Sequence, residues 1–146
     1  MTATDAPARP LAIGAAAERL GVSPRALRYY EQMGLLRPSA RTGGGNRLYS
    51  PSDLERVLRI REMQELLGAD LGTIRSILDH EDRTNAIRTA YAEGIGDPVA
   101  LLREAIELHE GLIAQVDGKL ARLQELRDGV EERRTRARTK LGELTS

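Results

Sequence analysis

The sequence predicts a mostly helical protein in which four short helices and a small β-hairpin precede one long C-terminal helix. Three observations support this prediction. In the first half of the chain, apolar segments with helical spacing end at Gly21, Gly34 and Gly68. Residues 42–46, rich in glycine, interrupt these segments and are typical of a hairpin tip. From Pro98 onward, apolar residues recur alternately every four and three positions, which is a coiled-coil pattern.

Composition excludes several classes of protein. The 146-residue chain has no cysteine, so disulfides and thiolate metal sites are ruled out, and we expect neither a metal site nor a cofactor. Neither of its two histidines lies in a readable acid–base cluster, so we expect no catalytic residues and no enzyme. No apolar run approaches the roughly 20 residues that span a bilayer, and the N-terminus lacks a signal peptide's hydrophobic core. We therefore expect a cytoplasmic protein with no membrane contact.

Charge is unevenly distributed along the chain. The formal net charge is zero, yet residues 19–47 hold 6 arginines and a single acidic residue, Glu31. A local basic patch is sufficient for phosphate contact, because screening limits the influence of charges more than about 10 Å away. The N-terminal half therefore has the charge of a nucleic-acid-binding surface.

The first two helices are predicted from their ends. Residues 1–10 are small and polar and are expected to be a disordered tail. An alanine-rich helix follows and ends at Gly21. Ser23 is a favourable N-cap and Pro24 a favourable first residue of the second helix. Two short helices joined by a tight glycine-containing turn form a helix-turn-helix pattern.

The second predicted helix has two different faces. Leu27 and Tyr30 share one face, and Arg25, Arg28 and Tyr29 fall on the other. Guanidinium and phenol groups on an exposed helix can contact phosphates and base edges in the major groove. The alternative is an ordinary solvated, arginine-rich helix.

The order of the motifs from residue 11 to 79 resembles the winged helix-turn-helix domain of the MerR family of bacterial transcription regulators. The matching segments read Ile13-Gly14, Gly21-Val22-Ser23, Arg25-Ala26-Leu27-Arg28-Tyr29-Tyr30-Glu31, Gly34-Leu35-Leu36-Arg37-Pro38 and Arg47-Leu48-Tyr49-Ser50. The resemblance implies that the second helix enters the major groove while the hairpin, the wing, holds the DNA backbone. Arg25 is added from its place on the first helical turn. The expected DNA-binding residues are Ser23, Arg25, Arg28, Tyr29, Thr42, Asn46, Arg47 and Tyr49.

Two further helices are expected to complete the N-terminal domain, residues 11–79. The run from Ser52 to Glu55 fits a capping box, and the helix that it begins should end at Gly68. Asp70 is expected to cap a fourth helix that ends near Leu78. Together the two helices should supply the core that a helix-turn-helix alone cannot build.

Residues 80–97 are predicted to form a connector with a short helix over residues 84–93, which the glycines and proline of residues 94–98 end. One interpretation is an effector or partner contact through His80, Arg88 and Tyr91. The other is a spacer that packs on a dimer.

Residues 98–130 are predicted to form a dimerisation helix, followed by a charged tail over residues 131–146. Nothing else in the chain is large enough to cover the apolar seam, so a second copy of the helix is the economical partner. The resemblance implies an antiparallel coiled coil. His109 is the one polar residue among the expected dimerisation residues, which are Leu102, Ile106, His109, Ile113, Val116, Leu120 and Leu123.

These features predict a homodimeric transcription regulator that binds an inverted repeat in double-stranded promoter DNA. The resemblance implies distortion of the promoter for RNA polymerase and residence at the nucleoid when bound to DNA. The effector, a small molecule or a protein, is not identified by the sequence. The alternatives are a repressor of the same fold with a protein co-regulator, and an architectural or excision factor that bends DNA.

Overall fold

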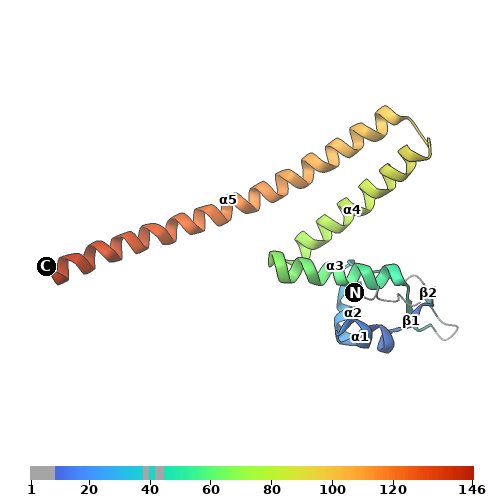
Figure 1. Cartoon of the computed structure of the whole chain (residues 1–146), viewed down its shortest axis with the longest axis horizontal. Coiled ribbons are helices and arrows are strands. Elements are labelled where there is room, and N and C mark those ends of the chain that lie inside the picture. Colours follow the sequence, from blue (N-terminus) through green and yellow to red (C-terminus); the bar gives the residue numbers. More distant parts are fainter. Residues whose placement is uncertain (1–8, 38–39, 42–44) are drawn as a thin grey trace, which may run out of the picture. The chain divides into compact units, whose positions relative to one another are not determined.

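The computed structural model describes residues 9–37, 40–41 and 45–146, and it divides into two compact units, Met1–Asp79 and His80–Ser146. The predicted fold class, mostly helical with a small sheet, is confirmed (Figure 1). Within the described ranges, none of the helices combines the length and apolar character needed to cross a bilayer. In chain order the elements are β1 (Leu11–Ala12), α1 (Ile13–Leu20), α2 (Pro24–Gln32), β2 (Ala40–Arg41), β3 (Arg47–Tyr49), α3 (Pro51–Leu67), α4 (Leu71–Ala92) and α5 (Pro98–Thr145).

The helix-turn-helix forms as the cap residues predict. Gly21 ends α1 with φ at 65°, a left-handed conformation that glycine adopts without a Cβ clash. The side chain of Ser23 accepts a hydrogen bond from the Ala26 N–H, and Pro24 takes the first helical position of α2. Gly34, with φ at 72°, turns the chain after α2. The turn between the two helices is therefore set by local residues.

The wing is part of a three-stranded antiparallel sheet in the order β1-β3-β2. Leu48 at its centre lies opposite Ala12 on one side and Ala40 on the other. The sequence predicted the hairpin but not the third strand over Leu11 and Ala12, which precedes the first helix. Pairing of β1 with β3 thus ties the start of α1 to the wing. Most of the predicted hairpin tip lies outside the described residues.

Helix α3 begins two residues earlier than predicted. Ser50 is the N-cap, and Asp53 completes the capping box by accepting from the Ser50 N–H at 2.8 Å. The predicted box from Ser52 to Glu55 is therefore wrong, because Pro51 occupies the first helical position and fixes the start. Gly68 ends α3 as predicted, and Asp70 accepts from the Thr73 N–H at 2.9 Å as the predicted cap.

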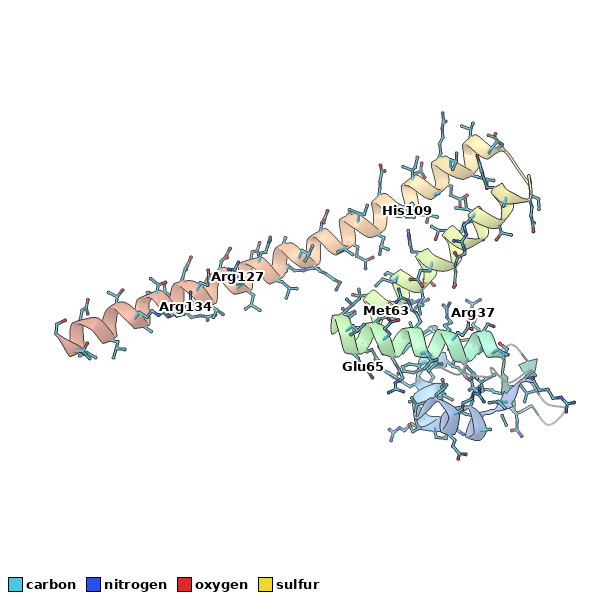
Figure 2. All side chains as sticks on the ribbon, viewed as in Figure 1. Arg37, Met63, Glu65, His109, Arg127 and Arg134 are labelled. Atoms are coloured by element: carbon cyan, nitrogen blue, oxygen red, sulfur yellow. The ribbon has the colours of Figure 1, made fainter. Side chains whose placement is uncertain are left out.

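The core of the first unit lies where α1, α2, α3, β3 and the start of α4 meet. Met63, one of its fully buried side chains, is labelled on α3 in Figure 2. Tyr30 also lies in the core, and its hydroxyl donates to Gln64 of α3 at 3.2 Å. The buried hydrophobic members are Ala16, Ala17, Leu20, Leu27, Tyr30, Leu35, Leu36, Tyr49, Leu54, Val57, Ile60, Met63, Ile74 and Leu78.

Helices α4 and α5 are both longer than predicted. Helix α4 runs without interruption from Leu71 to Ala92, so residues 84–92 continue the fourth helix and do not form a separate one. Helix α5 begins at Pro98, where the Asp97 side chain accepts from two backbone N–H groups, as the sequence predicts. It continues to Thr145, and the predicted charged tail therefore belongs to the same helix.

Candidate DNA-binding surface

The two faces of α2 have opposite environments. Leu27 is fully buried and Tyr30 retains 7% exposure, so this face anchors the helix in the core. Arg25 and Arg28 are exposed on the other face, and the Tyr29 side chain is 48% exposed. No hydrogen bond or ion pair with another described residue engages Arg25. A rigidly seated helix therefore presents two guanidinium groups and a phenol to solvent, as a helix that enters a groove requires.

Ser23 has a structural role at the start of this surface. Its Oγ accepts a hydrogen bond from the Ala26 N–H at 3.1 Å. The hydroxyl proton is still available to a phosphate oxygen, because a hydroxyl group donates and accepts at the same time. Capping and DNA contact are therefore compatible at this residue.

The base of the wing is joined to α2 through Glu31. The Tyr49 hydroxyl donates a hydrogen bond to Glu31 Oε1, and the Arg47 guanidinium forms an ion pair with Glu31 Oε2. Burial, together with the hydrogen bond to Glu31 and its negative charge, raises the pKa of Tyr49 well above its ordinary value. Tyr49 therefore stays protonated at neutral pH and serves as a donor to the carboxylate.

The prediction that the Tyr49 side chain contacts DNA is wrong for this structure. The side chain has no exposed surface, because β3 turns it toward the core. Arg47, in contrast, keeps about a third of its side-chain surface exposed (35%) beside the Glu31 carboxylate. Asn46 is exposed one residue earlier. Thr42, also predicted to bind DNA, lies outside the described residues.

Two arginines of α3 act inside the domain. Arg56 donates from Nε to the Leu35 carbonyl oxygen at 2.6 Å, and Arg61 donates from Nη1 to the Leu20 carbonyl oxygen at 2.7 Å. The Leu20 carbonyl ends α1, where the intrahelical ladder leaves acceptors unpaired. The Leu35 carbonyl lies in the segment that follows α2. The sequence did not reveal this role, since the arginines lie 21 and 41 residues from their acceptors. Some arginines of this domain are therefore exposed on its surface, and others form hydrogen bonds that hold its elements together.

The predicted dimerisation residues of α5 form an exposed apolar stripe. Its six aliphatic side chains, Leu102, Ile106, Ile113, Val116, Leu120 and Leu123, are between 40% and 62% exposed. Leu101, Leu108 and Leu112 are only half-buried, and Ile87 of α4 is buried to 5% exposure. His109 is exposed but forms a contact with His80 of α4 within the same chain.

The three residues predicted to contact an effector do not converge on one site. His80 and Tyr91 both lie on α4, eleven positions apart, which separates their Cα atoms by about 16 Å along the helix. Arg88 donates to the Asn85 side chain at 2.9 Å, and Tyr91 is exposed. A small effector would therefore not reach all three residues at once, whereas an extended partner lying along α4 could.

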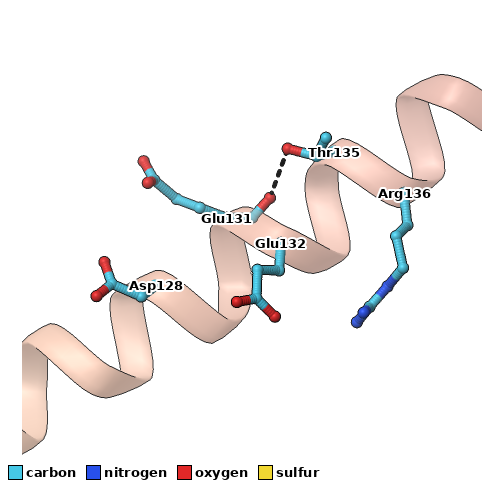
Figure 3. Close-up of a pocket in the computed structure, with 5 residues that line it drawn as sticks. All are labelled: Asp128, Glu131, Glu132, Thr135 and Arg136. Atoms are coloured by element: carbon cyan, nitrogen blue, oxygen red, sulfur yellow. Dashed lines mark hydrogen bonds between the residues drawn. The ribbon is translucent and has the colours of Figure 1, made fainter.

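The charged end of α5 contains a shallow hollow, drawn in Figure 3, that is lined by Asp128, Glu131, Glu132, Thr135 and Arg136. All five residues belong to one helix, and Thr135 donates to the Glu131 carbonyl oxygen at 3.0 Å. Arg127 and Arg134, both labelled in Figure 2, form ion pairs with Glu131 at 3.4 and 3.6 Å. Among the described residues, this is an open surface of one helix, on which Glu131 is paired with two arginines.

Comparison with known proteins identifies the family to which the chain belongs. Residues 11–81 match the model of the MerR HTH family regulatory proteins. The HTH-type transcriptional regulator YfmP of Bacillus subtilis is 31% identical over 101 residues, which are 69% of this chain and 71% of YfmP. This chain belongs to the MerR family. The resemblance inferred from the sequence is thereby confirmed, and residues 11–81 are the helix-turn-helix region of a DNA-binding transcription regulator.

Other MerR relatives differ in how much of their length is matched. The HTH-type transcriptional regulator ZntR of Escherichia coli is 33% identical over 116 residues, 80% of this chain and 77% of ZntR. Nodulation protein NolA of Bradyrhizobium elkanii is 35% identical over 119 residues, and the chain spans about half of its length (48%). YfmP and ZntR are both HTH-type transcriptional regulators, which agrees with the expectation of a transcription regulator.

Proposed function

We propose that this chain regulates transcription by binding, as a homodimer, an inverted repeat in promoter DNA. The exposure of Arg25, Arg28 and Tyr29 on a helix whose opposite face is buried carries the proposal. Arg25 reads base edges from the first turn of α2, and Arg28 contacts phosphate. Ser23, Asn46 and Arg47 add backbone contacts at the two ends of the surface.

The homodimer is supported by the exposed stripe of α5. Six aliphatic residues at coiled-coil spacing, from Leu102 to Leu123, are a large apolar area to leave in water. A second copy of α5, packed antiparallel, covers this stripe and links two DNA-binding domains. Linkage raises the effective concentration of the second domain at its half-site, so the dimer binds far more tightly than one domain alone.

The proposed dimer distorts the promoter between its half-sites so that RNA polymerase can engage both promoter elements. Bending of this kind costs about 1–6 kcal/mol and is offset by contacts from two helices and two wings. We place the protein in the cytoplasm, at the nucleoid when it is bound to DNA, where polymerase is its functional partner.

The test is a binding titration on duplex DNA selected from a random pool, read as affinity against salt concentration. Arg28→Ala is expected to weaken binding to all sequences and to reduce the slope of log affinity against log salt by about 1. Arg122→Ala, on the exposed surface of α5, is the matched control and should leave the slope unchanged. An equal slope for wild type and Arg28→Ala would remove the phosphate contact from Arg28.

A further inference from the structure

The only two histidines of the chain meet in the second unit. His80 lies on α4 and His109 on α5, 29 positions later. The Nδ1 atom of His109 lies 3.1 Å from the Nε2 atom of His80. Figure 2 labels His109 on α5. The sequence places His109 among the expected dimerisation residues and His80 at an expected effector contact, but neither expectation accounts for the contact of the two rings with each other.

The geometry of the pair differs from that of a straight hydrogen bond. The ring centroids are 4.9 Å apart and the ring planes are inclined by 60°. If the two nitrogens faced each other directly at the observed separation, the centroids would be about 5.4 Å apart, since each nitrogen lies about 1.15 Å from its ring centre. The two rings are therefore tilted relative to the line that joins the nitrogens.

Both distances fit two ligands of one metal ion. Imidazole nitrogens bind Zn²⁺ at about 2.0–2.1 Å. If the nitrogen–metal–nitrogen angle is about 90–110°, the two nitrogens are about 2.9–3.4 Å apart and the two ring centroids about 4.5–5.2 Å apart. The observed separations, 3.1 Å between nitrogens and 4.9 Å between centroids, fall within both ranges. A single ion bound by both nitrogens, with a nitrogen–metal–nitrogen angle of about 100°, accounts for both distances.

A hydrogen bond and a metal ion both leave one ring nitrogen of His80 without a partner. This nitrogen, Nδ1, is buried and has no hydrogen-bond partner among the described residues. That holds whether Nε2 shares a proton with His109 or binds an ion, so Nδ1 does not distinguish the two. A metal ion adds a bond to each of the two facing nitrogens in place of one hydrogen bond between them.

The charge around the pair favours a cation. Residues 75–83 of α4 and 103–110 of α5 together contain six carboxylates and three arginines, and Asp79 pairs with Arg75 at 3.9 Å. Arg83, one turn further along α4, forms an ion pair with Glu104 of α5, so its charge is balanced. A divalent ion at the histidines therefore enters a region of net negative charge.

Against the expectation from the sequence that the chain has no metal site, we propose that His80 and His109 form a binding site for a divalent transition metal ion of the class that prefers imidazole, namely Ni²⁺, Cu²⁺ or Zn²⁺. Water completes the coordination. The ion joins α4 to the first third of α5, at a position between Ile106 and Ile113 of the apolar stripe, and so fixes the hairpin that the two helices form. With two protein ligands, and with no partner for His80 Nδ1, the dissociation constant is expected to be about micromolar. This site does not depend on the DNA-binding function.

The test is a titration of the untagged, chelator-treated full chain with Ni²⁺, Cu²⁺ and Zn²⁺, each competed against a chromophoric chelator. The expected result is one ion per chain, with affinity in the order Ni²⁺ below Cu²⁺ and Cu²⁺ above Zn²⁺. His80→Gln and His109→Gln should each weaken binding by at least about tenfold. The matched control is Thr89→Ala on the exposed surface of α4, which should bind as wild type does.

Two results would overturn the proposal. One is the absence of stoichiometric binding to the wild-type chain, and the other is wild-type affinity in the double variant His80→Gln, His109→Gln, which would assign the binding to surface carboxylates. Circular dichroism checks that each variant stays helical. If a variant unfolds, the electron paramagnetic resonance spectrum of wild type with one equivalent of Cu²⁺ decides: coupling to two imidazole nitrogens supports the site, and coupling to one or none excludes it.

Discussion

Tyr49 of β3 donates its hydroxyl hydrogen bond to Glu31 of α2, and this contact joins the wing to the end of the proposed recognition helix. Arg47 pairs with the same carboxylate from the other end of β3. Glu31 is the one acidic residue in the basic stretch of residues 19–47. Its role in the fold is therefore to fix the position of the wing relative to α2.

Removing the hydroxyl in Tyr49→Phe keeps the buried ring but leaves one Glu31 oxygen without its donor. We expect the free energy of unfolding to fall by about 1.5–3 kcal/mol, the range for a hydrogen bond to a charged group. Urea unfolding followed by circular dichroism measures this change. Tyr91→Phe is the control, because Tyr91 is exposed and its hydroxyl is outside the core. Equal unfolding midpoints for Tyr49→Phe and wild type would show that the contact contributes nothing to stability.

Stability is also expected to decrease at alkaline pH. Burial and Glu31 raise the pKa of Tyr49 in the folded state above its ordinary value of about 10. The unfolded chain therefore releases this proton first as the pH rises, so the stabilisation is complete below about pH 10 and is lost as pH rises toward the folded-state pKa.

Urea midpoints measured between about pH 8 and 11 test this sign, since the range spans the ordinary tyrosine pKa. Tyr49→Phe should show a smaller decrease than wild type. Part of the decrease should remain, because burial also raises the pKa of Tyr30. A decrease of the same size in both proteins would remove Tyr49 as its source.

Arg56 and Arg28 should respond to substitution in opposite ways. Arg56→Ala leaves the Leu35 carbonyl without its donor, so the free energy of unfolding is expected to fall by about 1–3 kcal/mol. The salt dependence of DNA binding should stay that of wild type. Arg28→Ala should change the salt dependence and leave the unfolding midpoint almost unchanged, because the side chain is exposed. A reduced salt slope in Arg56→Ala would place that arginine on DNA.

A charge on the apolar stripe should separate the proposed dimer. We expect Val116→Asp combined with Leu120→Asp to give monomers in sedimentation equilibrium and to weaken binding to an inverted repeat by at least about 100-fold, because the second half-site loses its linkage. Ala121→Asp adds the same charge at an exposed position outside the stripe and serves as control. A double variant that stays dimeric would show that another surface holds the subunits.

Local chemistry made much of the fold predictable. Ser23, Gly21 and Asp97 act through bonds to neighbouring residues in sequence, and the structure places them at the predicted helix ends. The cap of α3 was harder, since Ser50 and Ser52 each precede an acidic residue by three positions and only the place of Pro51 separates them. The continuity of α4 could have been read from the sequence, because no glycine or proline interrupts residues 73–92.

The features that the sequence did not predict depend on distant residues. The residue type alone does not show whether Tyr49 faces DNA or the core. Its burial is decided by the packing of β3 on α1 and α3. Likewise, no periodicity links His80 with His109, because their contact follows from the length of the turn between α4 and α5. Local sequence patterns do not predict such contacts between distant elements.

The most direct test of the proposed function is selection of bound duplexes from a random pool, followed by footprinting of wild type and Arg25→Ala. We expect wild type to select two inverted half-sites and to protect both, with hyper-reactive base pairs between them, and Arg25→Ala to lose preference at one base position of each half-site. Selection of a single half-site, or the same sequence preference in both proteins, would contradict this expectation.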